Sequence, residues 1–378
     1  MTLVMGVTLS LLGPSVSYLE DRLDQSTSVI GILFAVIAAA NFVGAIAGGR
    51  AISSLGGHVT IHIGLVGFVI GTALLALGRD FATVAVGAAA IGASTGAVDA
   101  SANTMVVWAR PGRSGPSLNA LHFMFGVGSL LAPLATDRAI AFSTRLWPVI
   151  LVVSALAAVA MILVGRRPSP VDVPHDVDER PAASDRLVLV VAFFFLLYVG
   201  AEAGFSGWIH TYAEEVGFDG SLPAIATAVF WAAFALGRLI AIPVSSRVSP
   251  FRIVVVSAAM SIVGLVIMIV GRDWTGTVWV GSSLYGLAAA PQYPTMIALV
   301  DRHLSLSARA TSWIVGAAAI GGLLVPLSIG PLIDSVGATS MPIVVGAVSA
   351  IAFGWVLVIE RAVDRERATI GEPKLATA

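Results

Sequence analysis

The sequence predicts an all-α membrane protein of twelve transmembrane helices, built as two six-helix bundles that repeat each other. Of its 378 residues, 57% are hydrophobic and only 11% are charged, with a mean hydropathy of +0.94. Soluble domains carry about 25% charged residues. Apolar segments long enough to cross a bilayer, about 20 residues each, recur along the chain. The second six of these segments also resemble the first six.

The twelve predicted spans are separated mostly by short polar turns. They cover residues 2–19, 27–48, 59–78, 82–107, 116–136, 144–165, 187–212, 221–245, 251–271, 275–299, 308–331 and 339–360. One connection differs, because residues 166–186 are charged and proline-rich and are not expected to fold. This cytoplasmic linker separates an N-terminal bundle, 1–165, from a C-terminal bundle, 187–360, which a cytoplasmic tail, 361–378, follows. Five prolines inside spans are expected to kink them. These are Pro14, Pro133, Pro291, Pro294 and Pro326.

The distribution of Lys and Arg predicts the orientation, because cytoplasmic loops are enriched in these residues. With the N-terminus inside, 15 of the 21 Lys and Arg residues fall on the cytoplasmic side and five on the opposite side, while Arg238 lies within a span. We therefore expect a multi-pass protein of the plasma (cytoplasmic) membrane with both termini in the cytoplasm.

Three pairs of equivalent positions indicate the repeat. They are Pro133 and Pro326, 193 residues apart; Thr104 and Thr295, 191 apart; and Gly44 and Gly237, 193 apart. Because the pairs come from three different spans and agree within two residues, chance similarity does not explain them. The halves are therefore expected to share one internal architecture.

Asp99 lies in a long run, Val84 to Val107, that carries no other charge. A carboxylate at that depth costs at least about 2.5–3.5 kcal/mol on insertion scales, so it is expected to face a cavity or a partner. Asn103 follows four residues later and therefore projects from the same helical face. An ionisable residue inside a membrane span predicts solute or proton transport.

Motifs of glycine, aromatic and polar residues occur in five spans. They are Gly92-x3-Gly96-x2-Asp99-x3-Asn103, Leu118-Asn119-x2-His122-x2-Phe125-Gly126-x-Gly128-x4-Pro133, Tyr198-x-Gly200-x-Glu202-x-Gly204-x2-Gly207-Trp208-x3-Tyr212, Gly237-Arg238 and Pro291-Gln292-Tyr293-Pro294. With these motifs the chain resembles the major facilitator superfamily over essentially its whole length. Within that superfamily it looks like the fucose-permease branch of sugar–proton symporters, which includes the sodium-dependent glucose transporter-like animal proteins. The resemblance implies the major facilitator fold, with a solute site near the midplane between the halves.

Two departures from the superfamily pattern concern gating and coupling. The loop after span two usually carries an Asp and an Arg that latch the inward gate, but in the stretch from Gly49 through Gly56 to His58 serines, Ser53 and Ser54, stand at these two positions. We therefore expect apolar packing at that gate and a less favoured outward-open state. Fucose permease also carries a carboxylate in span one, where this chain has only Thr8 and Ser10 as side-chain polar groups before Pro14. A two-carboxylate proton relay therefore does not transfer directly.

Three titratable residues are candidates for coupling. Asp99 can gain and lose a proton as the cavity alternates between wet and dry. Alternatively, it is a structural hydrogen-bond or salt-bridge partner for another helix. His122 can donate to a sugar hydroxyl or to Asp99 and titrates in a suitable range, or it is a satisfied interhelical histidine. Glu202 replaces the missing acid of span one, or it clamps an unwound, glycine-rich stretch from Gly200 to Gly207.

The candidates for solute binding are aromatic and amide side chains. Aromatic rings stack on the apolar face of a sugar ring, and amides bind its hydroxyls. The candidates are Trp208, Trp231, Tyr293, Asn41, Asn103, Asn119 and Gln292. Gly237 joins Gly49 and Gly56 as a gating candidate, and so does Arg238, which we expect to snorkel or to cap a neighbouring helix end rather than to touch the solute.

These features predict a secondary active transporter of a small polar solute, most simply a monosaccharide, that works as a monomer. The sequence shows no phosphate loop, no metal-spaced cluster and no nucleophile–base pair, so we expect neither an enzyme nor a cofactor, and the net charge of −1 gives no reason to expect nucleic acid. A proton is the expected coupling ion, with sodium as the alternative. An efflux carrier for amphipathic molecules is the main rival function, and a non-transporting receptor is a third.

Overall fold

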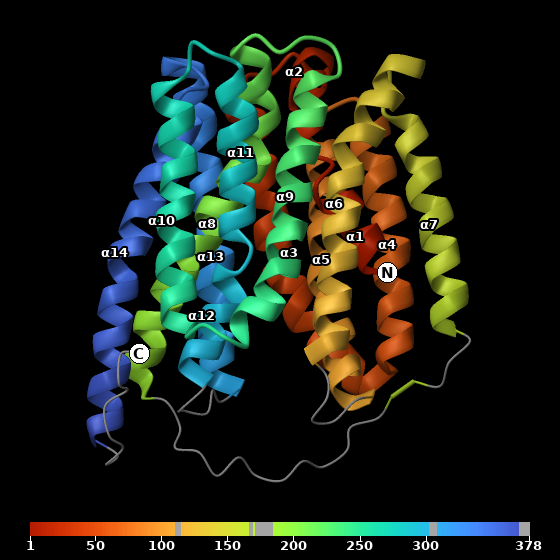
Figure 1. The fold of residues 1–378 in the computed structure, drawn as a ribbon. Helices are drawn as coiled ribbons and strands as arrows, with labels where there is room; N and C mark the ends of the chain where they lie inside the picture. The colour runs from red at the N-terminus through yellow and green to blue at the C-terminus, as the bar shows by residue number, and fades with distance from the viewer. Residues whose placement is uncertain (110–114, 166–168, 171–183, 302–307, 370–378) are drawn as a thin grey trace.

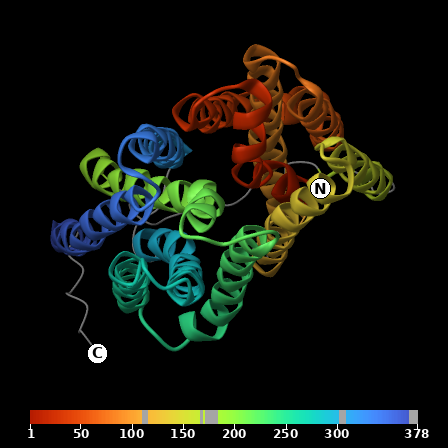
Figure 2. The ribbon, with the colours of Figure 1, turned by 90° about the horizontal axis from the view of Figure 1, so that it is seen from above.

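The computed structural model describes residues 1–109, 115–165, 169–170, 184–301 and 308–369, and across these residues the regular structure is helical. The helices form two bundles that stand side by side, the N-terminal half in red to yellow and the C-terminal half in green to blue (Figures 1 and 2). The N-terminal half consists of α1 (Thr2–Leu9), η1 (Gly13–Ser15), α2 (Val16–Leu23), α3 (Thr27–Leu55), α4 (Gly57–Leu77), α5 (Phe81–Ala109), α6 (Gly115–Ser143) and α7 (Trp147–Gly165). The C-terminal half consists of α8 (Asp185–Glu215), α9 (Leu222–Ser245), α10 (Pro250–Val270), α11 (Gly276–Ala289), α12 (Gln292–Asp301), α13 (Ala308–Val336) and α14 (Ser340–Thr369).

Helices occupy all twelve predicted spans, and two of the spans are broken. Among the described residues, eleven helical segments are long and apolar enough to cross a membrane. The first consists of α1, η1 and α2, with the interruption around Pro14, and the tenth consists of α11 and α12, which meet at Ala290 and Pro291. In contrast, Pro133 and Pro326 lie inside the continuous helices α6 and α13. The last helix, α14, continues beyond the predicted span, to Thr369.

Two local predictions were wrong. The stretch from Gly200 to Gly207 is not unwound, because α8 runs through it without a break. The predicted loop after span two is also mostly helix, since α3 continues to Leu55 and α4 begins at Gly57. Gly56 alone joins the two helices, with a φ of +87° that strongly favours glycine. Gly49 therefore lies within α3, with open space where a side chain would be.

The same glycine contacts recur in both halves, as the predicted repeat requires. A Cβ added at Gly71 on α4 would lie 2.8 Å from the carbonyl oxygen of Gly87 on α5, and one at Gly264 on α10 would lie 2.8 Å from that of Gly281 on α11. Likewise Gly128 on α6 faces the carbonyl of Leu3, and Gly321 on α13 faces the carbonyl of Leu196. Equivalent residues are 193 or 194 positions apart. Small residues thus let corresponding helix backbones approach closely in each bundle.

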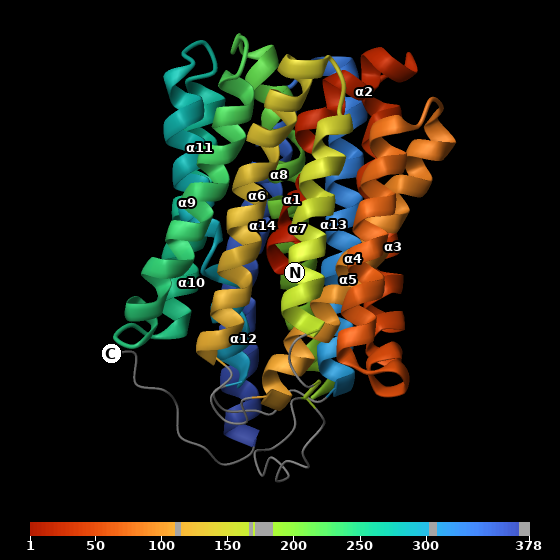
Figure 3. The same cartoon turned by 90° about the vertical axis from the view of Figure 1, so that its right-hand side faces the viewer.

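The two halves meet along α3 with α13 and along α6 with α9, and η1 contacts α8 and α9. Their closest polar contacts lie at one end, where α2 and the first turns of α3 and α9 are found (top of Figures 1 and 3). We call this the sealed end. There Trp208 of α8 is fully buried, and its ring centroid lies 5.1 Å from that of Phe34 on α3. The two halves are therefore in contact at this end.

Candidate functional site

Asp99 and Asn103 form a polar pair on the inner part of α5, with side chains that are half-buried. The Asn103 Nδ2 donates to Asp99 Oδ1 at 2.9 Å and to the Asp99 carbonyl oxygen, also at 2.9 Å. The prediction that the two residues share one helical face is therefore confirmed. The bond fixes the rotamers of both side chains and leaves the second carboxylate oxygen of Asp99 for another partner.

A second polar group lies in the C-terminal half. Glu202 on α8 interacts electrostatically with the hydroxyl of Tyr198, one turn earlier, and with the guanidinium of Arg238 on α9. The Arg238 guanidinium carbon also lies 5.0 Å from the ring centroid of Phe234, so the charge rests on an aromatic face. Arg238 is half-buried on α9, and the expectation that it snorkels or caps a neighbouring helix end stays a prediction.

Electrostatic interactions link the two polar groups across the boundary between the halves. Tyr293 on α12 interacts electrostatically with Asp99 of the other half as well as with Glu202 and Arg238. His122 on α6 in turn interacts with Arg238 on the opposite half. All three predicted coupling residues, Asp99, His122 and Glu202, thus belong to one electrostatic network that five helices position. Their roles in coupling stay predictions.

The remaining aromatic and amide candidates lie elsewhere. Trp208 donates its Nε1–H to the Pro326 carbonyl oxygen at 2.9 Å, within its own half. Trp231 is buried against Phe125 of α6, with ring centroids 6.0 Å apart, and its Nε1 has no hydrogen-bond partner among the described residues. Asn41 is half-buried on α3, where its backbone carbonyl faces Gly96. The side chain of Asn119 lies outside the described residues. Gly237 packs against the carbonyl of Leu287 on α11.

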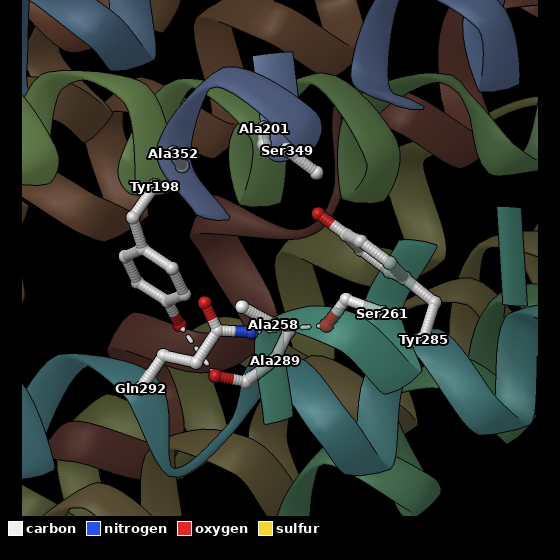
Figure 4. A pocket seen from close by; sticks show the side chains of 9 residues that line it. All are labelled: Tyr198, Ala201, Ala258, Ser261, Tyr285, Ala289, Gln292, Ser349 and Ala352. Carbon is white, nitrogen blue, oxygen red and sulfur yellow. Dashed lines mark hydrogen bonds between the residues drawn. The ribbon is translucent and has the colours of Figure 1, made fainter. Parts of the chain in front are cut away.

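Gln292 lies inside the C-terminal bundle instead of between the halves. It lines a small pocket with Tyr198, Ser261, Tyr285 and Ser349, side chains that come from five helices (Figure 4). Its Nε2 donates to Ser261 Oγ at 2.9 Å and to the Ala288 carbonyl oxygen at 3.2 Å. The Tyr198 hydroxyl donates to the carbonyl oxygen of Ala289 at 3.1 Å. Gln292 and Tyr198 therefore donate to backbone carbonyls near the break between α11 and α12, where the regular hydrogen bonding of the helix is interrupted.

We expect Gln292→Leu to destabilise the fold without weakening solute binding. The change leaves the Ala288 carbonyl without its side-chain donor and removes the bond to Ser261, at a cost of about 1–3 kcal/mol. The thermal unfolding midpoint of the purified protein should fall, while the KM for transport stays within about threefold. A KM that rises tenfold with an unchanged midpoint would place Gln292 in the solute site. Asn103→Leu is the matched comparison, because it changes an amide that does face the boundary.

Sequence reasoning missed two residues of this network, Tyr198 and Phe234. Both were inside or next to noted motifs, but no role had been given to them. Each lies four residues before a charged residue, Tyr198 before Glu202 and Phe234 before Arg238. Because residues four apart on a helix are neighbours, that spacing was a signal that could have found them.

Comparison with known proteins agrees with this architecture. The family model described as Major Facilitator Superfamily matches residues 1–326 and again residues 192–376. Sodium-dependent glucose transporter 1A of Mus musculus is 24% identical over 368 residues, which cover 87% of each chain. Sodium-dependent glucose transporter 1 of Homo sapiens is 20% identical over 368 residues, covering 87% of this chain and 71% of the relative.

Solved structures show the same fold. The crystal structure of a D-xylose–proton symporter superposes with a TM-score of 0.77 at 15% identity, covering 94% of both chains. A partially occluded inward open conformation of the xylose transporter XylE from E. coli gives 0.78 at 13% identity, covering 94% of this chain and 96% of that one. The motifs, the repeated helical halves and the family match lead to one conclusion: the chain belongs to the major facilitator superfamily.

Proposed function

We propose that the protein is a secondary active transporter that moves a monosaccharide across the plasma membrane by alternating access, coupled to protons through Asp99. The observation that carries the proposal is the electrostatic network between the halves, in which acids of both bundles face Tyr293. In a fold made of two repeated bundles, solute and coupling-ion sites lie near the midplane at the boundary between the repeats.

The chemistry of this network suits a sugar. The Asp99–Asn103 pair offers a carboxylate oxygen and an amide oxygen on one face, which can accept bonds from adjacent hydroxyls. Tyr293 supplies aromatic surface from the opposite half, where a pyranose ring can pack. His122 adds a ring nitrogen that donates or accepts according to its tautomer. The names of the relatives, glucose and xylose transporters, support the same solute class.

The coupling ion is proposed on chemical grounds. Among the described residues, Asp99 has one side-chain hydrogen-bond donor, Asn103, and no basic side chain acts on it, so binding a proton neutralises it directly. Glu202, by comparison, interacts with Arg238, which balances its charge. Asp99 is therefore the primary coupling acid and Glu202 the reserve. Sodium is the alternative ion, since several relatives are named as sodium-dependent transporters.

The sealed end is proposed to face outward, as the Lys and Arg distribution predicts. The segment 166–186 then lies in the cytoplasm with both termini, and solute reaches Asp99 from the cytoplasmic side in this conformation. Release of sugar into the cell from this state completes an uptake cycle.

Uptake of a panel of labelled monosaccharides into proteoliposomes tests the function. Three gradients are imposed separately: protons inward, sodium inward, and none. We expect one or a few sugars to accumulate above the outside concentration under the proton gradient alone. Accumulation under sodium alone would keep the solute and change the ion. If no sugar is taken up under any gradient while amphipathic, drug-like molecules are expelled, the protein is an efflux carrier instead.

A further inference from the structure

Three carboxylate–serine contacts join the two halves at the sealed end. Asp334 near the end of α13 accepts from the backbone N–H of Ser28 on α3 at 2.9 Å and also from the Ser28 hydroxyl. Asp137 on α6 accepts from the hydroxyl of Ser221, which precedes α9, at 2.8 Å. The third contact joins the Ser17 hydroxyl to Glu214. Asp334 also interacts with the side chains of Thr27 and Ser26, beside Ser28.

Two of these contacts are copies of each other. Ser28 and Ser221 are 193 residues apart, the same spacing as the glycine pairs of the repeat. Each serine lies at the N-terminus of the helix that forms the second span of its half, α3 or α9. Each acid lies towards the end of the fifth span of the other half, Asp137 on α6 and Asp334 on α13. The carboxylates are 197 residues apart, one helical turn more than the repeat.

Position makes both contacts favourable. The first N–H groups of a helix have no partner within it and carry a partial positive charge, so a carboxylate there is stabilised by direct bonds and by the helix dipole. Bonds to an ionised acceptor are also stronger than those between neutral groups. Each half thus supplies one carboxylate to a helix start of the other half. Closing the sealed end forms both contacts at once, and opening it breaks both.

The opposite end differs in sequence. The stretch from Gly49 to His58, where the superfamily carries its charged latch, has no Asp in this sequence. Among the described residues, the side-chain hydrogen bonds across the halves given above lie at the sealed end. The balance between the two conformations is therefore set largely by what happens at the sealed end.

We infer that Asp137 and Asp334 are paired latch residues of the gate at the sealed end, which hold the two halves closed there and set how often the site opens to that side. This inference rests on the proposed alternating access. It does not depend on which solute is carried, because the latch residues lie away from the network around Asp99.

A cysteine reporter can measure the opening directly, because the chain contains no cysteine. Ser15 is fully buried in η1, which contacts α8 and α9 of the other half. In Ser15→Cys, the rate of labelling by a membrane-impermeant maleimide reports exposure of the sealed end in the full-length protein in proteoliposomes. The variants Asp137→Ala, Asp334→Ala and the double variant are compared in this background, with no solute added.

We expect each single variant to be labelled about tenfold faster than the parent and the double variant about a hundredfold faster, because the contacts are separate and independent sites add in free energy. Asp273→Ala is the matched control, since this exposed acid lies beside Arg272 of its own half, 4.0 Å away. Ser221→Ala removes the hydroxyl and leaves both acids in place, so it should reproduce Asp137→Ala if that variant folds poorly.

The latch assignment is overturned if the double variant is labelled within twofold of the parent, or if Asp273→Ala accelerates labelling as much. It is also overturned if Ser221→Ala leaves the rate unchanged. Sugar uptake by the same proteoliposomes separates the two proposals. If the latch variants are labelled faster but no sugar is transported, the latch is supported and the proposed sugar transport is rejected. If sugar is transported but the latch variants are labelled at the parent rate, sugar transport is supported and the latch is rejected.

Discussion

Proteoliposomes containing Asp99→Asn are expected to lose gradient-driven sugar accumulation completely. With one proton per sugar, two pH units can drive accumulation of about 100-fold, since each pH unit is a tenfold concentration ratio worth about 1.4 kcal/mol. Asparagine keeps the size of the side chain and an oxygen for Asn103 Nδ2, but it cannot bind the coupling proton. The ratio of internal to external sugar should therefore fall to about 1, measured at steady state with the proton gradient maintained.

Counterflow exchange distinguishes coupling from general inactivation. Exchange of labelled for unlabelled sugar needs no net proton movement, so Asp99→Asn should retain it if only coupling is lost. Asp219→Asn is the control, because it makes the same chemical change at an exposed position between α8 and α9. Uphill accumulation by Asp99→Asn would remove Asp99 from the coupling role. In that case Glu202→Gln becomes the variant expected to uncouple.

The glycine-to-alanine changes at the repeated contacts are expected to have the largest effects on folding. A Cβ at Gly321 would overlap the carbonyl of Leu196, and one at Gly128 would overlap the carbonyl of Leu3. Both obstacles are helix backbone, which cannot move aside as a flexible side chain does. We expect each Gly→Ala change to cost about 3 kcal/mol or more, since overpacking alone costs about 1–3 kcal/mol. The yield of monodisperse protein on size exclusion should fall sharply for both.

Gly354→Ala provides the comparison for these variants. Gly354 lies within α14 with no atom near the position of a new Cβ. Alanine there should leave the yield unchanged or raise stability by up to about 1 kcal/mol, because it favours the helix. Equal losses for all three variants would mean that helix glycines matter for insertion in general. Normal yields for Gly128→Ala and Gly321→Ala would show that the helices within each half do not pack through these contacts.

The sequence was enough for the fold and for most of the central network because both depend on strong local signals. Long apolar segments predict helices directly, and the cost of a charge in a membrane directs attention to Asp99, Glu202 and His122. The repeat then predicts that equivalent helices pack alike, which Gly71 and Gly264 confirm.

The sequence could not predict which neighbours the side chains of a helix face, or where a helix continues without a break. Gln292 and Tyr293 are adjacent, yet one lies within its bundle and the other interacts with Asp99 across the boundary. Along α8, the three glycines Gly200, Gly204 and Gly207 suggested unwinding, but the helix is continuous there and packs against α13. The latch residues Asp137 and Asp334 were missed because their serine partners lie in the other half of the chain. Only the closed arrangement brings them together.

The hydroxyl of Tyr198 has a single hydrogen to donate, and this fact connects two distant parts of the C-terminal half. In this structure the hydroxyl donates to the carbonyl of Ala289, at the break between α11 and α12. A protonated Glu202 beside it can donate to the phenol oxygen and leave that bond intact, whereas an ionised Glu202 only accepts and therefore competes for the same hydrogen. The charge of one carboxyl group thereby governs one of the bonds that hold the broken span, which carries Tyr293.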